Sequence, residues 1–100
     1  MVIKLKTMPG RAREWIDAWT PLAKYCKEHE PRTLSYEASI SDKEPDTVLI
    51  FERFVTKADL TDIHQLSAPF IAFRSHPAQS VVLEKDGHSY YESNVGFMRR

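Results

Sequence analysis

The segment from residue 47 to residue 55, TVLIFERFV, constrains the fold more than any other part of this 100-residue chain. Successive side chains of a strand point to opposite faces of a sheet, and in this segment both sets are apolar. One set is Val48, Ile50 and Phe54, and the other is Leu49, Phe51 and Val55. An antiparallel strand that is apolar on both faces must be covered on both. Any fold for this chain therefore has to supply two covers for this strand.

The segment before it predicts the first partner strand. Residues 33–40, TLSYEASI, alternate apolar and polar side chains, and SDKEPD after them supplies turn residues, so the two strands form a hairpin. If the hairpin pairs around residue 44, Tyr36 and Glu52 stand opposite each other. Arg53 and Glu37 then point to the other face, where they can meet diagonally as a pair that fixes the register or a dimer.

The N-terminal third predicts a strand followed by a helix. Residues 1–8 alternate, and from Arg11 the apolar positions change to helical spacing that continues to about Glu28. Pro21 removes an amide from the middle of this helix, so we expect a kink at Thr20. These elements add one strand with a wet face and one amphipathic helix.

The C-terminal half predicts helices and a last strand. Thr56 begins one helix as its cap, and Ser67 begins another with Pro69 in the first turn. Pro77 ends or restarts that helix, and residues 78–87 fit either a helical turn or a strand. Residues 88–95, HSYYESNV, predict the final strand, on which Tyr90 and Tyr91 face opposite ways, so only one of them can face a pocket.

The order of elements is strand, helix, strand, strand, helices, strand. It predicts a single α+β domain over residues 1–100 with the ferredoxin-like arrangement, in which helices cover one face of an antiparallel sheet. The second face of the central strand then stays bare. Because exposed apolar patches mark interfaces, we expect a homodimer with the two sheets face to face.

Charge and cysteine content exclude several partners. With 14 basic and 14 acidic residues, the chain has no electrostatic footprint for nucleic acid or an anionic membrane. The single cysteine, Cys26, falls on the apolar stripe of the first helix and cannot form an internal disulfide. With neither a signal-peptide pattern nor a membrane span, we expect a cytoplasmic protein. The four histidines show no metal-ligand motif, and no Gly-rich phosphate loop is present.

Three stretches of the chain resemble the antibiotic biosynthesis monooxygenase family, whose members are small dimeric α+β barrels. MPGRAREWIDAW is similar to the family's Pro-Gly turn and first helix. TLSYEASISDKEPDTVLIFERF is similar to its central hairpin, and ADLTDIHQLSAPFIAF to its histidine-bearing helix and the Ser/Phe segment that follows. The resemblance covers most of the chain and is weakest from Pro77 to Arg100.

The resemblance implies a pocket between the sheet and the helices and, as in some members, oxygenation that uses neither metal nor flavin. Such chemistry requires a substrate that can itself give an electron to O₂, such as a small quinol or a polyketide-like anthrone. Two departures matter: Pro69 replaces a second histidine common in the family, and His64 and Arg74 stand where the haem-degrading branch has its tryptophan and its iron-ligating histidine. We therefore expect no haem and no other cofactor.

His64 is the candidate base, because histidine titrates near neutral pH without perturbation. Arg74 could stabilise an oxyanion, and Tyr36 completes the catalytic set. The residues expected to bind substrate are Glu52, Phe54, Phe70, Phe73 and Trp19, with Phe70 and Phe73 at a pocket wall. Each has an ordinary structural alternative: His64 as a half-buried side chain at a helix end, Arg74 as a solvated residue, and buried Glu52 as the partner of a structural hydrogen bond.

Two other functions fit the same pattern. A non-catalytic dimeric module could bind a small ligand with His64 and Tyr36 lining its cavity. A cyclase or isomerase would need the same base but no electron-rich substrate. Because one fold supports many chemistries, the fold does not choose among them.

Overall fold

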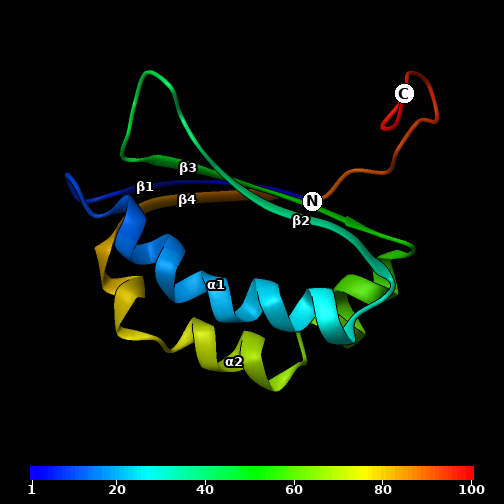
Figure 1. Cartoon of the computed structure of the whole chain (residues 1–100), viewed down its shortest axis with the longest axis horizontal. Coiled ribbons are helices and arrows are strands. Elements are labelled where there is room, and N and C mark those ends of the chain that lie inside the picture. The colour runs from blue at the N-terminus through cyan, green and yellow to red at the C-terminus, as the bar shows by residue number, and fades with distance from the viewer.

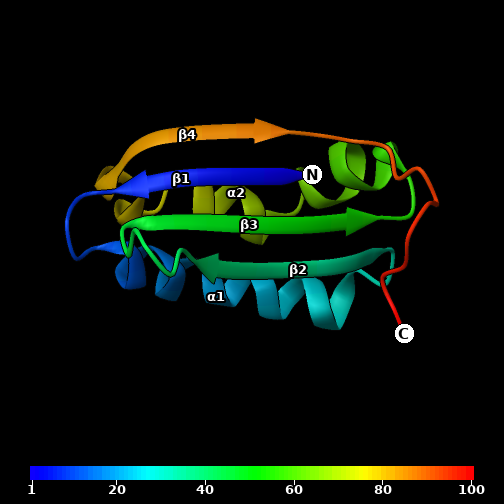
Figure 2. The ribbon, with the colours of Figure 1, turned by 90° about the horizontal axis from the view of Figure 1, so that it is seen from above.

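Four antiparallel strands form one sheet in the order β2-β3-β1-β4 in the computed structural model, which describes residues 1–100 (Figure 1, Figure 2). The strands are β1 (Val2–Thr7), β2 (Thr33–Ile40), β3 (Thr47–Phe54) and β4 (Val82–His88). The helices are α1 (Ala12–His29), the π-helix η1 (Asp59–His64), α2 (Ala68–Arg74) and the 3-10 helix η2 (Pro77–Val81). All the helices lie on one face of the sheet (Figure 1). This arrangement confirms the ferredoxin-like α+β class.

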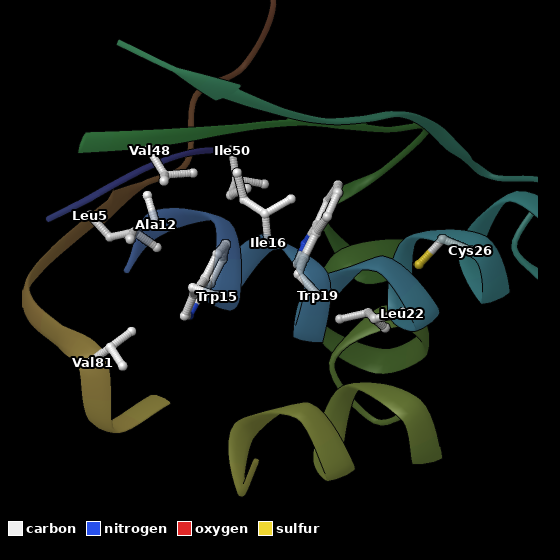
Figure 3. Close-up of a cluster of buried hydrophobic side chains, with 10 residues drawn as sticks. All are labelled: Leu5, Ala12, Trp15, Ile16, Trp19, Leu22, Cys26, Val48, Ile50 and Val81. Carbon is white, nitrogen blue, oxygen red and sulfur yellow. The ribbon is translucent and has the colours of Figure 1, made fainter. Parts of the chain in front are cut away.

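The core lies between α1 and the inward face of the sheet (Figure 3). Val48 and Ile50 of β3 are 0% and 1% exposed. They belong to the same cluster as the buried helix side chains Trp15, Ile16 and Trp19. Each such side chain contributes about 1.5–3 kcal/mol by leaving water. The inward cover predicted for β3 is therefore α1.

Helix α1 passes through Pro21 without restarting. The side chain of Thr20 donates a hydrogen bond to the carbonyl of Ile16 at 2.8 Å, one turn back. Leu22 and Cys26, on the far side of the proline, remain 2% exposed. The apolar stripe thus holds the helix on the sheet across the missing amide.

The capping residues predicted for the two following helices are confirmed. The Thr56 hydroxyl accepts from the Asp59 amide at 3.3 Å, and the Asp59 carboxylate accepts from the Thr56 amide at 2.8 Å. The Ser67 side chain accepts from the amide of Phe70, and Pro69 occupies the first turn of α2. Each end satisfies amides that have no partner inside their own helix.

The last strand lies earlier in the sequence than predicted. It is β4, Val82–His88, whereas residues 89–100 form no strand. Its backbone pairs with β1, and this pairing does not require apolar and polar side chains to alternate along the strand. Gly87 lies within β4: it pairs with Ile3, and a Cβ there would meet a Met1 side-chain carbon at 3.3 Å. Tyr90 therefore lies on no strand, and the same holds for Tyr91.

The outward face of the sheet mixes apolar and charged side chains. Leu49 and Val55 are 39% and 47% exposed, and Phe51 is half-buried. Arg53 forms its ion pair with Glu92 of the C-terminal segment, not with Glu37 as the hairpin register had suggested. The second face of β3 is thus only partly covered by its own chain.

None of the helices combines the length and the apolar composition that a membrane span requires.

Candidate functional site

His64, at the end of η1, is fully buried, with 0% exposure. The wide turn of η1 is closed by a hydrogen bond from the amide of Gln65 to the carbonyl of Leu60 at 2.9 Å. That five-residue spacing is typical of π-helical turns, which are rare and frequent at functional sites. It directs the imidazole between α1 and the sheet.

One ring nitrogen of His64 is bound at the C-terminal end of α1. Nδ1 lies 2.9 Å from Glu30 Oε1 and 3.5 Å from Cys26 Sγ. Glu30 is itself 4% exposed, and its Oε1 also accepts from the Thr33 hydroxyl at 2.9 Å. A carboxylate accepts, so this contact assigns the proton of a neutral imidazole to Nδ1 and leaves Nε2 as an acceptor.

Aromatic rings surround this imidazole. The ring centroids of Tyr36, Phe54 and Phe70 lie 5.0, 5.4 and 5.1 Å from that of His64. Trp19 stacks on the other side of Tyr36 at 4.8 Å. Burial, with a smaller contribution from Glu52, raises the pKa of the Tyr36 phenol, so this residue stays protonated. The environment of His64 is therefore dry and apolar except for its carboxylates.

A second carboxylate, Glu52, faces the free nitrogen of His64. Glu52 stands opposite Tyr36 in the hairpin, as predicted, and its Oε1 lies 4.0 Å from His64 Nε2. Glu52 is 4% exposed, and this burial raises its pKa to about 7, against the smaller lowering effects of the N-terminal ammonium and Lys85. Glu52 therefore exchanges a proton near neutral pH.

Two buried polar atoms of this cluster have no hydrogen-bond partner. They are His64 Nε2 and Glu30 Oε2. A buried polar atom without a partner costs about 1–3 kcal/mol, and such groups in native proteins have a reason. Because Nε2 faces Glu52, a small movement of that carboxylate would bring the two into hydrogen-bond distance.

Cys26, Glu30 and His64 are close enough together to raise the question of a metal. Their potential ligand atoms lie within 4.8 Å of one another. Burial raises the pKa of the Cys26 thiol to about 12, so in the absence of an ion it stays a thiol. Nδ1 is also engaged by Glu30, and the group offers three ligand atoms where structural zinc takes four. We therefore interpret these residues as a hydrogen-bonded cluster.

A pocket of about 510 Å³ reaches this cluster from outside. It lies where β3 leaves the sheet, and Glu52 and Phe54 from β3 line it together with Leu60 from η1. His64 does not line it. The volume is in the range of small-molecule sites. Glu52 is thus the carboxylate that both lines this pocket and lies beside His64.

The C-terminal segment forms one wall of the pocket, and it runs past the end of β3 in Figure 2. Glu92 pairs with Arg53, and Ser89 accepts a hydrogen bond from Lys57 at 2.7 Å. Tyr90 and Tyr91 both line the pocket while remaining 68% and 88% exposed. Both tyrosines therefore line the pocket, and the prediction that only one of them can face it is wrong.

Most of the predicted site residues come together. One contiguous group contains six of them: His64, Tyr36, Glu52, Phe54, Phe70 and Trp19. Phe73 instead packs edge-on against Trp15, with ring centroids 5.2 Å apart. Arg74 ends α2, is exposed and forms no ion pair, so nothing joins it to the cluster.

Glu30 is the site residue that sequence reasoning missed. It follows the last turn of α1 in EHEPR, a segment that reads as a solvated helix end. The available signal was its spacing: Glu30 is four residues after Cys26, so it continues the buried stripe of the helix. A carboxylate at that place needs a buried partner, and His64 is the one it has.

Comparison with solved structures shows similar folds at low sequence identity. A proposed antibiotic biosynthesis monooxygenase from Nitrosomonas europaea has a TM-score of 0.83 at 15% identity, with 94% of this chain and 88% of that one covered. One from Bacteroides thetaiotaomicron has a TM-score of 0.83 at 16% identity, covering 99% and 92%. Another from Caulobacter crescentus has a TM-score of 0.73 at 22% identity, covering 89% and 87%.

A search of curated protein sequences finds no match. The family model described as antibiotic biosynthesis monooxygenase matches residues 1–76, which include β1 to β3, His64 and α2. With three quarters of its length matched, this chain belongs to the antibiotic biosynthesis monooxygenase family.

Proposed function

We propose that this protein is a cofactor-independent monooxygenase that oxidises a small phenolic aromatic of the quinol or anthrone type with O₂. The observation that carries the proposal is a pocket lined by aromatic residues and by Glu52, whose carboxylate lies 4.0 Å from the unpaired nitrogen of His64. It offers a planar ligand apolar walls beside groups that can accept a proton. These are the requirements of the reaction on the protein side.

The chemistry follows from the electronic state of oxygen. Triplet O₂ reacts slowly with closed-shell molecules, but a phenolate can transfer one electron to it. The resulting radical and superoxide combine to a peroxide, which loses water and leaves a carbonyl. For an anthrone the balance is CH₂ + O₂ → C=O + H₂O. The protein has to remove the first proton, hold the anion and exclude water.

The proposed active form is a homodimer. Leu49, Phe51 and Val55 lie on the outward face of β3, and the first and last of these are well exposed. A second copy would shield them, and it would add a further wall near the pocket, since Phe51 and Val55 also line it. Leu49→Lys should then convert a dimer into a monomer in sedimentation velocity runs at micromolar concentration. A wild-type protein that sediments as a monomer would remove this part of the proposal.

The second candidate is a ligand-binding module without turnover. The observation that favours it is the complete burial of His64, which keeps the imidazole from direct contact with a ligand in the pocket. A binder would show saturable quenching of Trp19 fluorescence and no consumption of oxygen.

An oxygen electrode distinguishes the two. We expect hydroquinone or an anthrone to give oxygen uptake that depends on enzyme concentration and falls at least 100-fold in His64→Gln, in line with loss of an acid-base group. His29→Gln is the matched control, because the His29 side chain is 59% exposed on the same chain. Product formed anaerobically at an unchanged oxidation level would instead indicate a cyclase or isomerase. No uptake with any electron-rich phenol would end the oxygenase proposal.

A further inference from the structure

We propose that Glu52 is the residue that takes the proton from the bound ligand and that it passes this proton to His64, which Glu30 holds in the accepting tautomer. The inference rests on the proposed function for its substrate class. It assigns the three buried groups different roles: Glu52 is the catalytic residue, while His64 and Glu30 act through it.

Access separates the two candidate bases. His64 is 0% exposed and is not among the residues that line the pocket, whereas Glu52, at 4% exposure, is one of them. A base must come within about 3.2 Å of the proton it removes, directly or through one water. Only Glu52 can meet that condition for a ligand in the pocket.

The arrangement of atoms fixes the direction of transfer. Because a carboxylate accepts, the 2.9 Å contact with Glu30 Oε1 assigns the proton of a neutral His64 to Nδ1; Nε2 then holds the lone pair, and it has no partner. The 4.0 Å between Nε2 and Glu52 Oε1 exceeds a hydrogen bond, so the transfer requires the glutamate side chain to move closer. Catalytic hydrogen bonds are often long before the ligand binds and shorten afterwards.

The proton balance is simple. The phenol O–H bond breaks as an O–H bond forms on Glu52, and the glutamic acid then donates to Nε2. The products are a phenolate, a carboxylate at Glu52 and an imidazolium between two carboxylates. No electron moves in these steps. Glu30 stabilises the imidazolium as it forms, which makes the second transfer favourable.

The charges around Glu52 suit this role. The N-terminal ammonium of Met1 and the ammonium of Lys85 favour its ionised form, while Glu30 and burial favour the neutral form. The balance leaves the pKa of Glu52 at about 7. A general base works best when its pKa lies near the working pH.

The first experiment follows the proton without turnover. The probe is 4-nitrophenol, whose phenolate absorbs visible light, added to ¹⁵N-histidine-labelled protein at pH 6. In the wild type we expect a rise in bound phenolate and protonation of His64 Nε2 in the ¹⁵N NMR spectrum. In Glu52→Gln both changes should be absent, although the probe still binds. Glu37→Gln, which alters an exposed carboxylate on the outward face, should behave as the wild type.

Glu30→Gln tests the positioning role. A glutamine amide can donate to Nδ1, so the histidine proton should move to Nε2 before any ligand is added. The NMR spectrum of the free variant should show this change of tautomer, which a merely structural role for Glu30 would not produce. Rates give a second readout: Glu52→Gln should lower kcat for hydroquinone about 100-fold with KM within about twofold.

The outcomes separate the relay from the oxygenation. If the wild type consumes no oxygen but His64 is protonated when the probe binds, the oxygenase proposal fails and the relay stands. If the probe does not bind the wild type, or binds without changing His64, the relay is wrong whatever the oxygen electrode shows. Protonation of His64 in Glu52→Gln to the wild-type extent would also overturn it.

Discussion

His64→Leu should destabilise the protein strongly, because it leaves the Glu30 carboxylate buried with a single donor. Glu30 is 4% exposed, and without the imidazole only the Thr33 hydroxyl, at 2.9 Å, would remain on it. An unpaired buried polar group costs about 1–3 kcal/mol and a broken buried ion pair about 3–5 kcal/mol. Since one donor survives, we expect the free energy of unfolding to fall by about 3 kcal/mol, the upper end of the first range and the lower end of the second.

Urea denaturation at fixed protein concentration measures this loss. With a slope of about 1.5 kcal/mol per M, the midpoint should fall by about 2 M. Fixed concentration matters because dissociation of a dimer would change the apparent stability. His29→Leu is the control: its side chain is 59% exposed beside Glu28, so we expect a change within about 0.5 kcal/mol.

A double variant decides the cause. Glu30→Leu combined with His64→Leu removes both partners, and apolar replacement of a buried pair is often neutral or stabilising. We expect the double variant to lie within about 1 kcal/mol of the wild type. If the double variant is as unstable as His64→Leu alone, the cost comes from lost packing and the reasoning about the Glu30–His64 pair is refuted.

Three further predictions concern other parts of the chain. Glu52 binds its proton more tightly in the folded state because its pKa rises from 4.5 to about 7, so its contribution to stability is present below pH 4.5 and is lost as pH rises through 7. Urea titrations between pH 5 and 8 should show this fall in the wild type and not in Glu52→Gln; equal slopes would contradict it. Ile50→Ala, at 1% exposure, should cost about 2–5 kcal/mol by urea denaturation, whereas a cost under about 1 kcal/mol would mean that the core can close around the cavity. Ser67→Ala should cost about 1 kcal/mol by thermal unfolding through loss of the cap on Phe70, and an unchanged melting temperature would count against that bond.

The sequence was informative wherever side-chain periodicity determines structure. The two-faced strand, the amphipathic helix and the caps at Thr56 and Ser67 all rest on local spacing, and the structure has them where they were predicted. The facing of Tyr36 and Glu52 also followed from the hairpin register. These features depend on neighbours in the chain or on a single turn.

The prediction failed where backbone pairing alone determines structure. β4 is an edge strand held by β1, and its sequence, VLEKDGH, carries no alternation to reveal it. The tyrosines that follow resemble a strand because aromatic residues favour sheets, yet they serve as a pocket wall. Arg53 illustrates the same limit: its partner, Glu92, is 39 residues away and comes close only when the C-terminal segment passes the end of β3.

The site shows why a histidine in an apolar segment was hard to interpret from sequence. A buried imidazole needs a polar partner, and although the spacing from Cys26 places Glu30 on the buried stripe of the helix, nothing in the sequence pairs it with His64. Both carboxylates lie beside His64. Its Nδ1 is hydrogen-bonded to Glu30, and its Nε2 has no hydrogen-bond partner and lies 4.0 Å from Glu52. A purely structural histidine would be better served by two satisfied nitrogens. The unpaired Nε2, kept at 4.0 Å from a carboxylate that titrates near neutrality, is what distinguishes a proton relay from a packed core residue.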